Sequence, residues 1–284
     1  MRADGDAGDC RCGEAPERAN DFYWENERVG FRAYGPGDEH NWSGIDVFSK
    51  LPNAAISCGE LLQIHDFAGN WHITPHKGIL DDYAVGSGRG VGGVAFRRNG
   101  EWLADYGNWV AYRIIENSRE RCAFELDYKL PFGGTMTLGI ALEKGSSLFR
   151  ETVSLSKDVP TQGLEVGVGL DLNPAREHAG DVAVDAERFI VSLFEAPHAR
   201  EGAEASRMSA IYAIPGENAA LAIADEPNGA KMIITKPLGA DDAGRTVLAV
   251  FAGADGTECG RFATAGAWHG YVRDHFDKSK EKNK

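Results

Sequence analysis

Residues 74–96, TPHKGILDDYAVGSGRGVGGVAF, bring side chains able to move protons close to an arginine. Imidazole and phenol groups serve as general acids and bases, and a guanidinium can hold a carboxylate through two parallel hydrogen bonds. We therefore predict that His76 and Tyr83 transfer protons and that Arg89 binds the acidic group of a substrate. Asp82 is expected to orient the His76 imidazole, because a carboxylate fixes the tautomer of a neighbouring histidine.

Residues 21–112 are rich in aromatic side chains. They contain five of the six tryptophans and five of the eight tyrosines. Aromatic rings stack on the apolar faces of sugars, while charged and amide groups order hydroxyls and carboxylates. The residues predicted to bind substrate on this basis are Arg32, Tyr34, Trp24, His72 and Asn108. A tryptophan-rich core is the alternative explanation, above all for Trp102 and Trp109.

The run Gly88-Arg89-Gly90-Val91-Gly92-Gly93 has the spacing of a dinucleotide-binding fingerprint. That fingerprint requires a helix after its last glycine, with the phosphates at the helix N-terminus. Here Val94 and Phe96 alternate toward the turn RRNG (97–100), a pattern typical of two strands. We predict that the glycines permit positive φ angles, bulges and close backbone contacts, and that a bulge aims Arg89 at a ligand.

Two histidines at the start of residues 72–96 raise the question of a metal site. His72 and His76 are four residues apart, but Pro75 lies between them and disfavours a helical arrangement. We expect no cofactor, and a structural or catalytic divalent metal stays as the alternative.

Composition excludes several classes of partner. The formal net charge of −13 works against nucleic-acid binding, which needs basic patches. No apolar run approaches the roughly 20 residues that span a bilayer. The five cysteines are widely spread and odd in number, so we expect buried or idle thiols. Without a signal-like apolar segment the chain is expected to be cytoplasmic, or periplasmic or secreted if an export signal has been removed. The oligomeric state is left open.

Short alternating segments separated by Gly, Pro, Asn and Asp dominate the chain. In RVGFRAYG (28–35), period-two alternation places Val29 and Phe31 on one face of a strand. Similar runs recur at 109–115, 121–130, 134–144, 148–155, 164–172, 188–195, 209–214, 219–224, 231–236 and 245–253. Many short strands with frequent turns predict an all-β, large antiparallel β-sandwich. Apolar residues at helical spacing over 263–281 predict a C-terminal helix. We expect one sandwich domain at 21–277, a disordered acidic tail at 1–20 and a charged, frayed tail at 278–284.

Four segments in order resemble a bacterial family catalogued as domain of unknown function 4861. They are NDFYWENERVGFRAYGP (20–36), SGIDVF (43–48), HKGILDDYAVGSGRGVGG (76–93) and DYGNW (105–109). The chain departs from the family pattern at Glu27, at Phe48 and in the loop around Lys77. The resemblance implies a galactose-mutarotase-like supersandwich and a role in polysaccharide degradation. It also implies, through a relative with that activity, an oligosaccharide dehydratase that leaves a 4,5-unsaturated sugar.

Removing water from a uronic acid requires a base at C5, an acid for the departing C4 hydroxyl, and a cation that neutralises the carboxylate. Arg32 or Arg89, with Asn108, would hold the carboxylate, and His76 or Tyr83 would transfer the protons. The expected substrate is an acidic oligosaccharide. One alternative is an aldose epimerase-like enzyme with Glu195 or Glu217 as base. The other is a non-catalytic glycan-binding module that uses the tryptophans as a platform.

Overall fold

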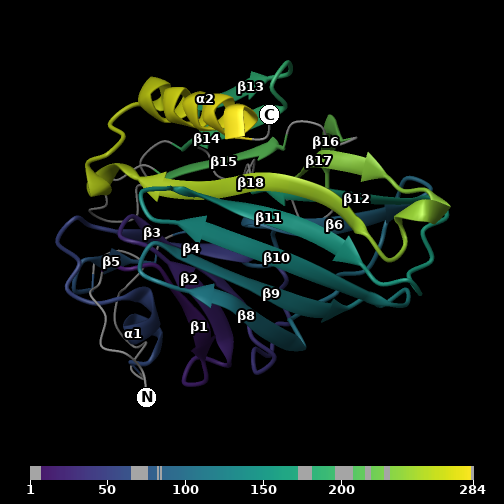
Figure 1. The fold of residues 1–284 in the computed structure, drawn as a ribbon, viewed down its shortest axis with the longest axis horizontal. Coiled ribbons are helices and arrows are strands. Elements are labelled where there is room, and N and C mark those ends of the chain that lie inside the picture. Colours follow the sequence, from purple (N-terminus) through teal and green to yellow (C-terminus); the bar gives the residue numbers. More distant parts are fainter. Residues whose placement is uncertain are drawn as a thin grey trace.

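Eighteen strands arranged in antiparallel sheets make up about half of the described chain (Figure 1). The computed structural model describes residues 8–64, 76–81, 83, 85–171, 181–195, 207–214, 219–226 and 231–282. The strands of the first part are β1 (Arg11–Ala15), β2 (Asp21–Glu25), β3 (Val29–Ala33), β4 (Ile45–Lys50), β5 (Ile79–Leu80), β6 (Val91–Arg98), β7 (Glu101–Trp102), β8 (Ala111–Asn117) and β9 (Arg121–Lys129). Those of the second part are β10 (Thr135–Glu143), β11 (Leu148–Leu155), β12 (Leu164–Leu170), β13 (Asp181–Asp185), β14 (Ile190–Phe194), β15 (Arg207–Ala213), β16 (Ala220–Asp225), β17 (Lys231–Pro237) and β18 (Thr246–Gly256).

Three sheets build the sandwich. An eight-stranded sheet has the order β13-β14-β15-β18-β11-β10-β9-β8, and two five-stranded sheets have the orders β1-β2-β3-β4-β5 and β16-β17-β12-β6-β7. An isolated parallel bridge between Ile45 and Gly90 joins the two smaller sheets. One core contains side chains of all three sheets, such as Phe31, Val166 and Leu138. The predicted antiparallel β-sandwich is therefore confirmed.

Period-two alternation explains how single strands face this core. Along β10 the buried residues are Met136, Leu138, Ile140 and Leu142, and the residues between them are half-buried. The same alternation occurs on β9, where Leu126 pairs with Leu138 across the ladder. The apolar residues of the two strands thus share one sheet face, as the sequence pattern requires.

The C-terminal helix α2 (Ala265–Lys282) lies on the outer face of the large sheet, next to β13 and β14 (Figure 1). Trp268, Val272 and Phe276, at helical spacing, pack in a second core with Met208 and Tyr212 of β15. A short helix α1 (Cys58–Leu62) begins at Ser57, whose hydroxyl accepts the N–H of Glu60. The expected C-terminal helix is confirmed, while α1 was not predicted. No helix in the described part of the chain is long and apolar enough to cross a bilayer.

Both ends of the chain are more ordered than expected. Residues 11–15, placed in a disordered tail by their composition, form β1, because Cys12 is buried and its N–H donates to Asn117 Oδ1 at 3.1 Å. Residues 278–282 continue α2, and buried Phe276 and Ser279 anchor its last turns. These two expectations were wrong within the described residues. All five cysteines are buried free thiols, as expected.

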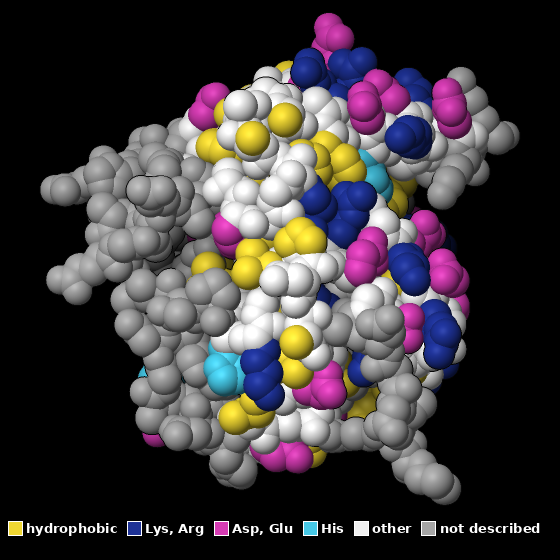
Figure 2. Space-filling model, turned by 90° about the vertical axis from the view of Figure 1, so that its left-hand side faces the viewer, with side chains coloured by type: hydrophobic (Ala, Val, Ile, Leu, Met, Phe, Trp, Pro, Cys, Tyr) yellow, Lys and Arg dark blue, Asp and Glu magenta, His cyan; other side chains and the backbone are white. Residues whose placement is uncertain are grey.

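Figure 2 shows one side of the molecule, turned by 90° from the first view. On its described part, basic and acidic side chains lie interspersed and apolar side chains gather between them. No large surface of a single charge sign appears on this side of the described chain.

Candidate functional site

The glycine-rich turn at Gly88–Gly90 holds a carboxylate of the same chain. The backbone N–H groups of Arg89 and Gly90 donate to Asp171 Oδ1 and Oδ2, each at 2.8 Å. A Cβ atom on Gly88 would lie 2.2 Å from Asp171 Oδ2, and Gly90 has a φ of +58°. Glycine is therefore required at both positions, by a close contact at one and by backbone conformation at the other.

The segment after this turn is a strand. β6 begins at Val91 and pairs with β7 around the Asn99-Gly100 turn, as predicted for RRNG. The dinucleotide fingerprint thus lacks the helix whose N-terminus would face a pyrophosphate. The predicted role of the glycines in positive φ angles and close backbone contacts is confirmed.

The side chain of Arg89 is aimed at other protein groups. Its Nε and Nη2 donate to Glu226 at 2.7–3.0 Å, and its Nη1 donates to Ser43 Oγ at 2.8 Å and to Asp105 Oδ2 at 3.1 Å. Burial by itself lowers the pKa of Arg89, but the hydrogen bonds that Arg89 donates to Glu226 and the charges of the nearby carboxylates outweigh burial and raise that pKa. Arg89 is therefore a permanent cation. Of its two carboxylate partners, the Glu226 side chain is buried at 3% exposure, and the Asp105 side chain is 36% exposed.

Asp171 is a buried carboxyl group whose pKa is raised. Burial raises its pKa to about 7, although the N–H groups of Arg89 and Gly90 and the Arg89 charge act in the opposite direction. A carboxyl group with that pKa exchanges its proton near neutrality, which suits general base catalysis. The sequence prediction missed Asp171, although an acid at the end of the apolar run LEVGVGLDL was a signal for it.

Tyr83 lies directly beside this centre. Its Oη is 3.4 Å from the carbonyl oxygen of Gly90, to which the phenol can donate. Burial, followed by the negative charges of Asp171 and Glu195, raises the pKa of Tyr83 well above 10. Tyr83 is therefore a neutral phenol, a proton donor next to a carboxyl group that titrates near neutrality.

Arg32 and Tyr34 belong to a second buried polar cluster. The Arg32 guanidinium donates to Asp46 at 2.7 and 2.9 Å and to Asp21 at 3.2 Å, and it lies 3.7 Å from Asp81. Tyr34 Oη is 3.5 Å from Asp46 Oδ2, and burial raises the pKa of Asp46 to about 7. Arg32 and Tyr34 are each only 5% exposed. The structure thus pairs Arg32 with carboxylates of its own chain instead of presenting it on an open sheet surface.

Trp24 and Asn108 also have structural positions. Trp24 is fully buried, stacked on Phe31 at 5.6 Å, so its expected role as a sugar-binding surface is wrong. Its place on β2 puts the indole between the sheets, where the apolar pattern of the strand directs it. Asn108 Nδ2 donates to the carbonyl oxygens of Gly35 at 2.6 Å and Asp38 at 3.3 Å, so the side chain fixes a loop.

His76 lies apart from Tyr83 and Arg89. It forms a bridge with Ile79, and Ile79 pairs with Lys50 at the end of β4. The opposite end of β4, Ile45, contacts Gly90. Five residue steps along β4 separate these ends by roughly 17 Å, at about 3.3 Å per step. The predicted meeting of His76 with Tyr83 and Arg89 is therefore not found. Asp82, His72 and Glu217 lie outside the described residues.

The residues that the structure brings together are Tyr83, Arg89, Asp105, Asp171 and Glu226. Across the described ranges, no three His, Cys, Asp or Glu side chains are grouped so as to hold a metal ion. The arrangement can carry out proton transfer beside a fixed cation. It combines a base poised near neutrality, a phenolic acid and a guanidinium.

Comparison with known proteins identifies the family. The family model described as "Domain of unknown function (DUF4861)" matches residues 3–202, more than half of the chain. The chain belongs to this family. The match includes Tyr83, Arg89, Asp105 and Asp171, whereas Glu226 lies beyond it. The resemblance found in the motifs of residues 20–109 is thereby confirmed.

The DUF4861 chain is also similar to one curated protein in sequence and to one solved structure in fold. "Uncharacterized protein P7" of Formosa agariphila is 27% identical over 197 residues, which are 64% of this chain and 47% of that protein. The chain thus spans about half the length of this relative. Among solved structures, the heparan sulfate lyase HepC from Pedobacter heparinus aligns with a TM-score of 0.44 and 11% identity, over 86% of this chain and 36% of that one.

Proposed function

We propose that this DUF4861 protein is a carbon–oxygen lyase that removes water from the non-reducing-end uronic acid of an oligosaccharide, leaving a 4,5-unsaturated sugar. The single observation that carries the proposal is the pair formed by Asp171, whose pKa is about 7, and Tyr83, which is held neutral beside it. Burial raises both pKa values, so near neutral pH Asp171 can take up a proton while Tyr83 keeps its own, as a base and an acid that act in one reaction must. The resemblance of residues 20–109 to the family implies the same activity.

In this mechanism, Asp171 takes the C5 proton and Tyr83 gives its proton to the departing C4 hydroxyl. The C5–H bond breaks, its electron pair forms the C4–C5 double bond, and the C4–O bond breaks to release water. Asp171 gains one proton and Tyr83 loses one, and a net proton transfer from Asp171 to Tyr83, direct or through solvent, restores both. The assignment follows the pKa directions, since a phenol with a raised pKa is a poor base at neutral pH and Asp171 is half ionised near pH 7.

The C5 proton becomes acidic only when a cation neutralises the adjacent carboxylate as charge develops on it. Arg89 supplies that cation through Nη1, the nitrogen that donates to Asp105. The Asp105 side chain is 36% exposed, whereas Glu226 is sealed on the other edge of the guanidinium. A substrate carboxylate can therefore take the place of Asp105 while Glu226 keeps Arg89 oriented.

The test uses oligosaccharides with a saturated uronic acid at the non-reducing end and records the ultraviolet absorbance of the conjugated product. Tyr83→Phe is expected to lower the rate about a hundredfold or more, the usual contribution of a general acid. Tyr112→Phe is the matched control, because it removes a phenol oxygen that lies on an exposed strand and contacts Glu14. The proposal fails if no absorbance develops with the wild-type protein, or if Tyr83→Phe and Tyr112→Phe are equally active.

Neither alternative explains these contacts as well. A glycan-binding module would use exposed tryptophans, but Trp24 and Trp109 are buried at 0% and 5% exposure, and Trp42 and Trp102 are half-buried. An epimerase-like enzyme receives some support from Glu195, because its charge acts on Tyr83. Epimerisation would change the sugar's NMR signals without generating ultraviolet absorbance, so the same incubation separates the two reactions.

A further inference from the structure

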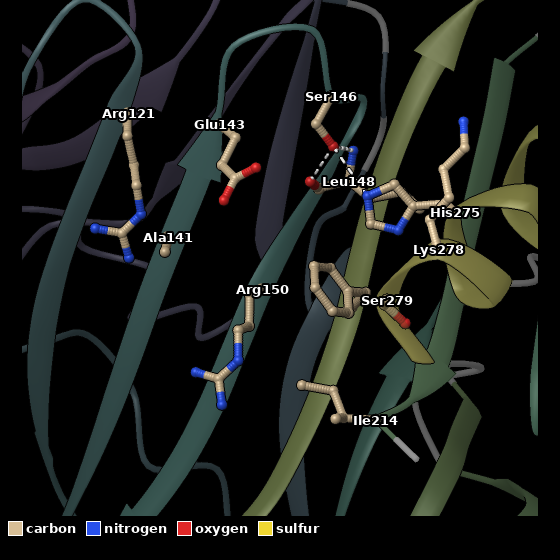
Figure 3. A pocket seen from close by; sticks show the side chains of 11 residues that line it. Arg121, Ala141, Glu143, Ser146, Leu148, Arg150, Ile214, His275, Lys278 and Ser279 are labelled. Atoms are coloured by element: carbon tan, nitrogen blue, oxygen red, sulfur yellow. Dashed lines mark hydrogen bonds between the residues drawn. The ribbon is translucent and has the colours of Figure 1, made fainter. Parts of the chain in front are cut away.

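A cavity of about 340 Å³ lies on the outer face of the large sheet, at the edge of α2 (Figure 3). It contains none of the residues of the Tyr83–Asp171 site. Its lining comes from β9, β10, β11 and β18, from the segments after β10 and β15, and from α2; the chief side chains are Arg121, Ala141, Glu143, Arg150, Phe251, His275 and Lys278.

The strand register explains why there is a hollow here. Ala141, Arg150 and Phe251 are direct cross-strand neighbours, Ala141 with Arg150 and Arg150 with Phe251. The next neighbour of Phe251 is Tyr212, which α2 covers. Helix α2 therefore covers Tyr212 but leaves Phe251 only partly covered. On the other side of Arg150, the small side chain of Ala141 leaves space. In Figure 3, Arg150 projects from β11 beside Ala141 of the neighbouring strand β10.

The wall formed by α2 is held in place by polar contacts. His275 Nδ1 is 2.7 Å from Tyr212 Oη, and His275 Nε2 is 3.4 Å from Ser146 Oγ. Ser146 Oγ also donates to the carbonyl oxygen of Leu148 at 2.5 Å. The Phe251 ring packs on Tyr212 at 5.1 Å and edge-on to His275 at 4.9 Å. An aromatic face and a histidine are therefore fixed at the cavity before any ligand arrives.

The cavity is basic in a chain whose net charge is −13. Three cationic side chains line it, Arg121, Arg150 and Lys278, against the single carboxylate of Glu143. Arg121 is paired with Glu116 at 2.6 Å. Among the described residues, neither Arg150 nor Lys278 has a carboxylate within 4.0 Å. Two cations without such partners beside a half-buried aromatic ring form a local site for an anion with an apolar face.

We propose that this cavity binds one acidic sugar unit, with its carboxylate or sulfate on Arg150, its apolar face on Phe251, and Lys278 as a second cation at the opposite side of the cavity (Figure 3). The anionic character of the ligand follows from the cavity alone, and its assignment as a sugar rests on the proposed function. The site is separate from the elimination site. It would hold either another sugar unit of the same charged glycan or a unit of a second glycan chain.

The test is a titration of the wild-type protein, followed by NMR or calorimetry, with D-glucuronate, D-glucose 6-sulfate and neutral D-glucose. Both acidic sugars are expected to bind and glucose is not, and the tighter of the two identifies the charged group. Arg150→Gln and Lys278→Gln are each expected to raise the Kd about tenfold or more, the loss typical of one charge-assisted hydrogen bond. Lys129→Gln, an exposed change of the same charge at the end of β9, is the matched control and should leave the Kd unchanged.

Equal binding of glucose, or a Kd that Arg150→Gln and Lys278→Gln leave unchanged, overturns the proposal. Failure here is distinct from failure of the proposed lyase function. If glucuronate binding is lost in Tyr83→Phe but kept in Arg150→Gln, the sugar binds at the Tyr83–Asp171 site and not in this cavity. If the protein shows no elimination but binds acidic sugars through Arg150, the cavity proposal stands alone.

Discussion

Glu151 on β11 lies directly against Gly92 on β6, where a Cβ atom would stand 2.7 Å from Glu151 Oε2. The glutamate is fully buried between the sheets, and within the described residues neither carboxyl oxygen has a hydrogen-bond partner. Burial raises the pKa of Glu151 well above 4.5, so the side chain is held as a neutral acid. The missing side chain at Gly92 provides the space that it occupies.

This burial predicts a pH-dependent stability. Because the pKa of Glu151 is higher in the folded protein than in the unfolded chain, the folded state binds more protons above pH 4.5. The free energy of unfolding should therefore fall as pH rises from 4.5 toward the folded pKa, by about 1.4 kcal/mol per pH unit for this group. Denaturant unfolding at several pH values should show a flatter dependence in Glu151→Gln. Glu101→Gln, an exposed position, should retain the wild-type slope; equal slopes in all three proteins would contradict the account.

The Arg89–Glu226 pair predicts a large loss of stability when one partner is removed. Both side chains are buried, so Glu226→Gln leaves the guanidinium in a protein interior without its main carboxylate. The expected loss in the free energy of unfolding is about 3–5 kcal/mol. Glu165→Gln is the matched control, since Glu165 pairs with Arg97 at a half-exposed position, where the loss should be below about 1 kcal/mol. Similar losses of unfolding free energy in the two variants would mean that the buried Arg89–Glu226 pair stabilises the fold no more than the half-exposed Arg97–Glu165 pair.

Gly88→Ala should disrupt the turn that holds Asp171. The added methyl group would lie 2.2 Å from Asp171 Oδ2, so the carboxylate or the turn must move. We expect lower thermal stability and, if Asp171 is the base, loss of elimination activity. Gly266→Ala provides the comparison, because a Cβ there meets nothing within 4 Å and helix α2 favours alanine. A Gly88→Ala protein with wild-type stability and rate would show that the contact is unimportant.

His76→Ala should keep most of the activity. His76 lies at the Lys50 end of β4, whereas Tyr83 and Arg89 lie at the Ile45 end. Measured rates within a few fold of wild type are expected. A rate as low as that of Tyr83→Phe would bring His76 back into the reaction and would require a site larger than the one described.

Much of the fold could be predicted from local patterns. The strands from β8 to β12 and the helix α2 follow directly from periods of two and of about 3.6 residues, because one face of each packs on a core. β1 could not be predicted, since its residues RCGEA have little apolar character. β1 is held by pairing with β2 and by the hydrogen bond from Cys12 N–H to Asn117 Oδ1, which joins residues more than a hundred positions apart.

The candidate site was harder to predict. The short-range signal singled out Tyr83 and Arg89, which the structure places at one turn, because their glycine-rich surroundings mark a special backbone conformation. Asp171 and Glu226 are brought to that turn only by the sheet β16-β17-β12-β6-β7 and the strands beside it, and no local spacing announces them. Aromatic composition suggested a sugar-binding role for Trp24, which is buried. Composition does not separate the two roles, because side chains that can face a sugar also fill the space between two sheets.

The most direct test of the central claim is the initial rate of absorbance increase with uronate-terminated oligosaccharides, measured for wild type, Asp171→Asn and the surface control Asp158→Asn. The account predicts turnover by wild type and Asp158→Asn, with an apparent pKa near 7 on the acid side of the profile, and a rate at least about a hundredfold lower for folded Asp171→Asn. A folded Asp171→Asn protein that turns over at the wild-type rate with an unchanged pH profile would contradict it.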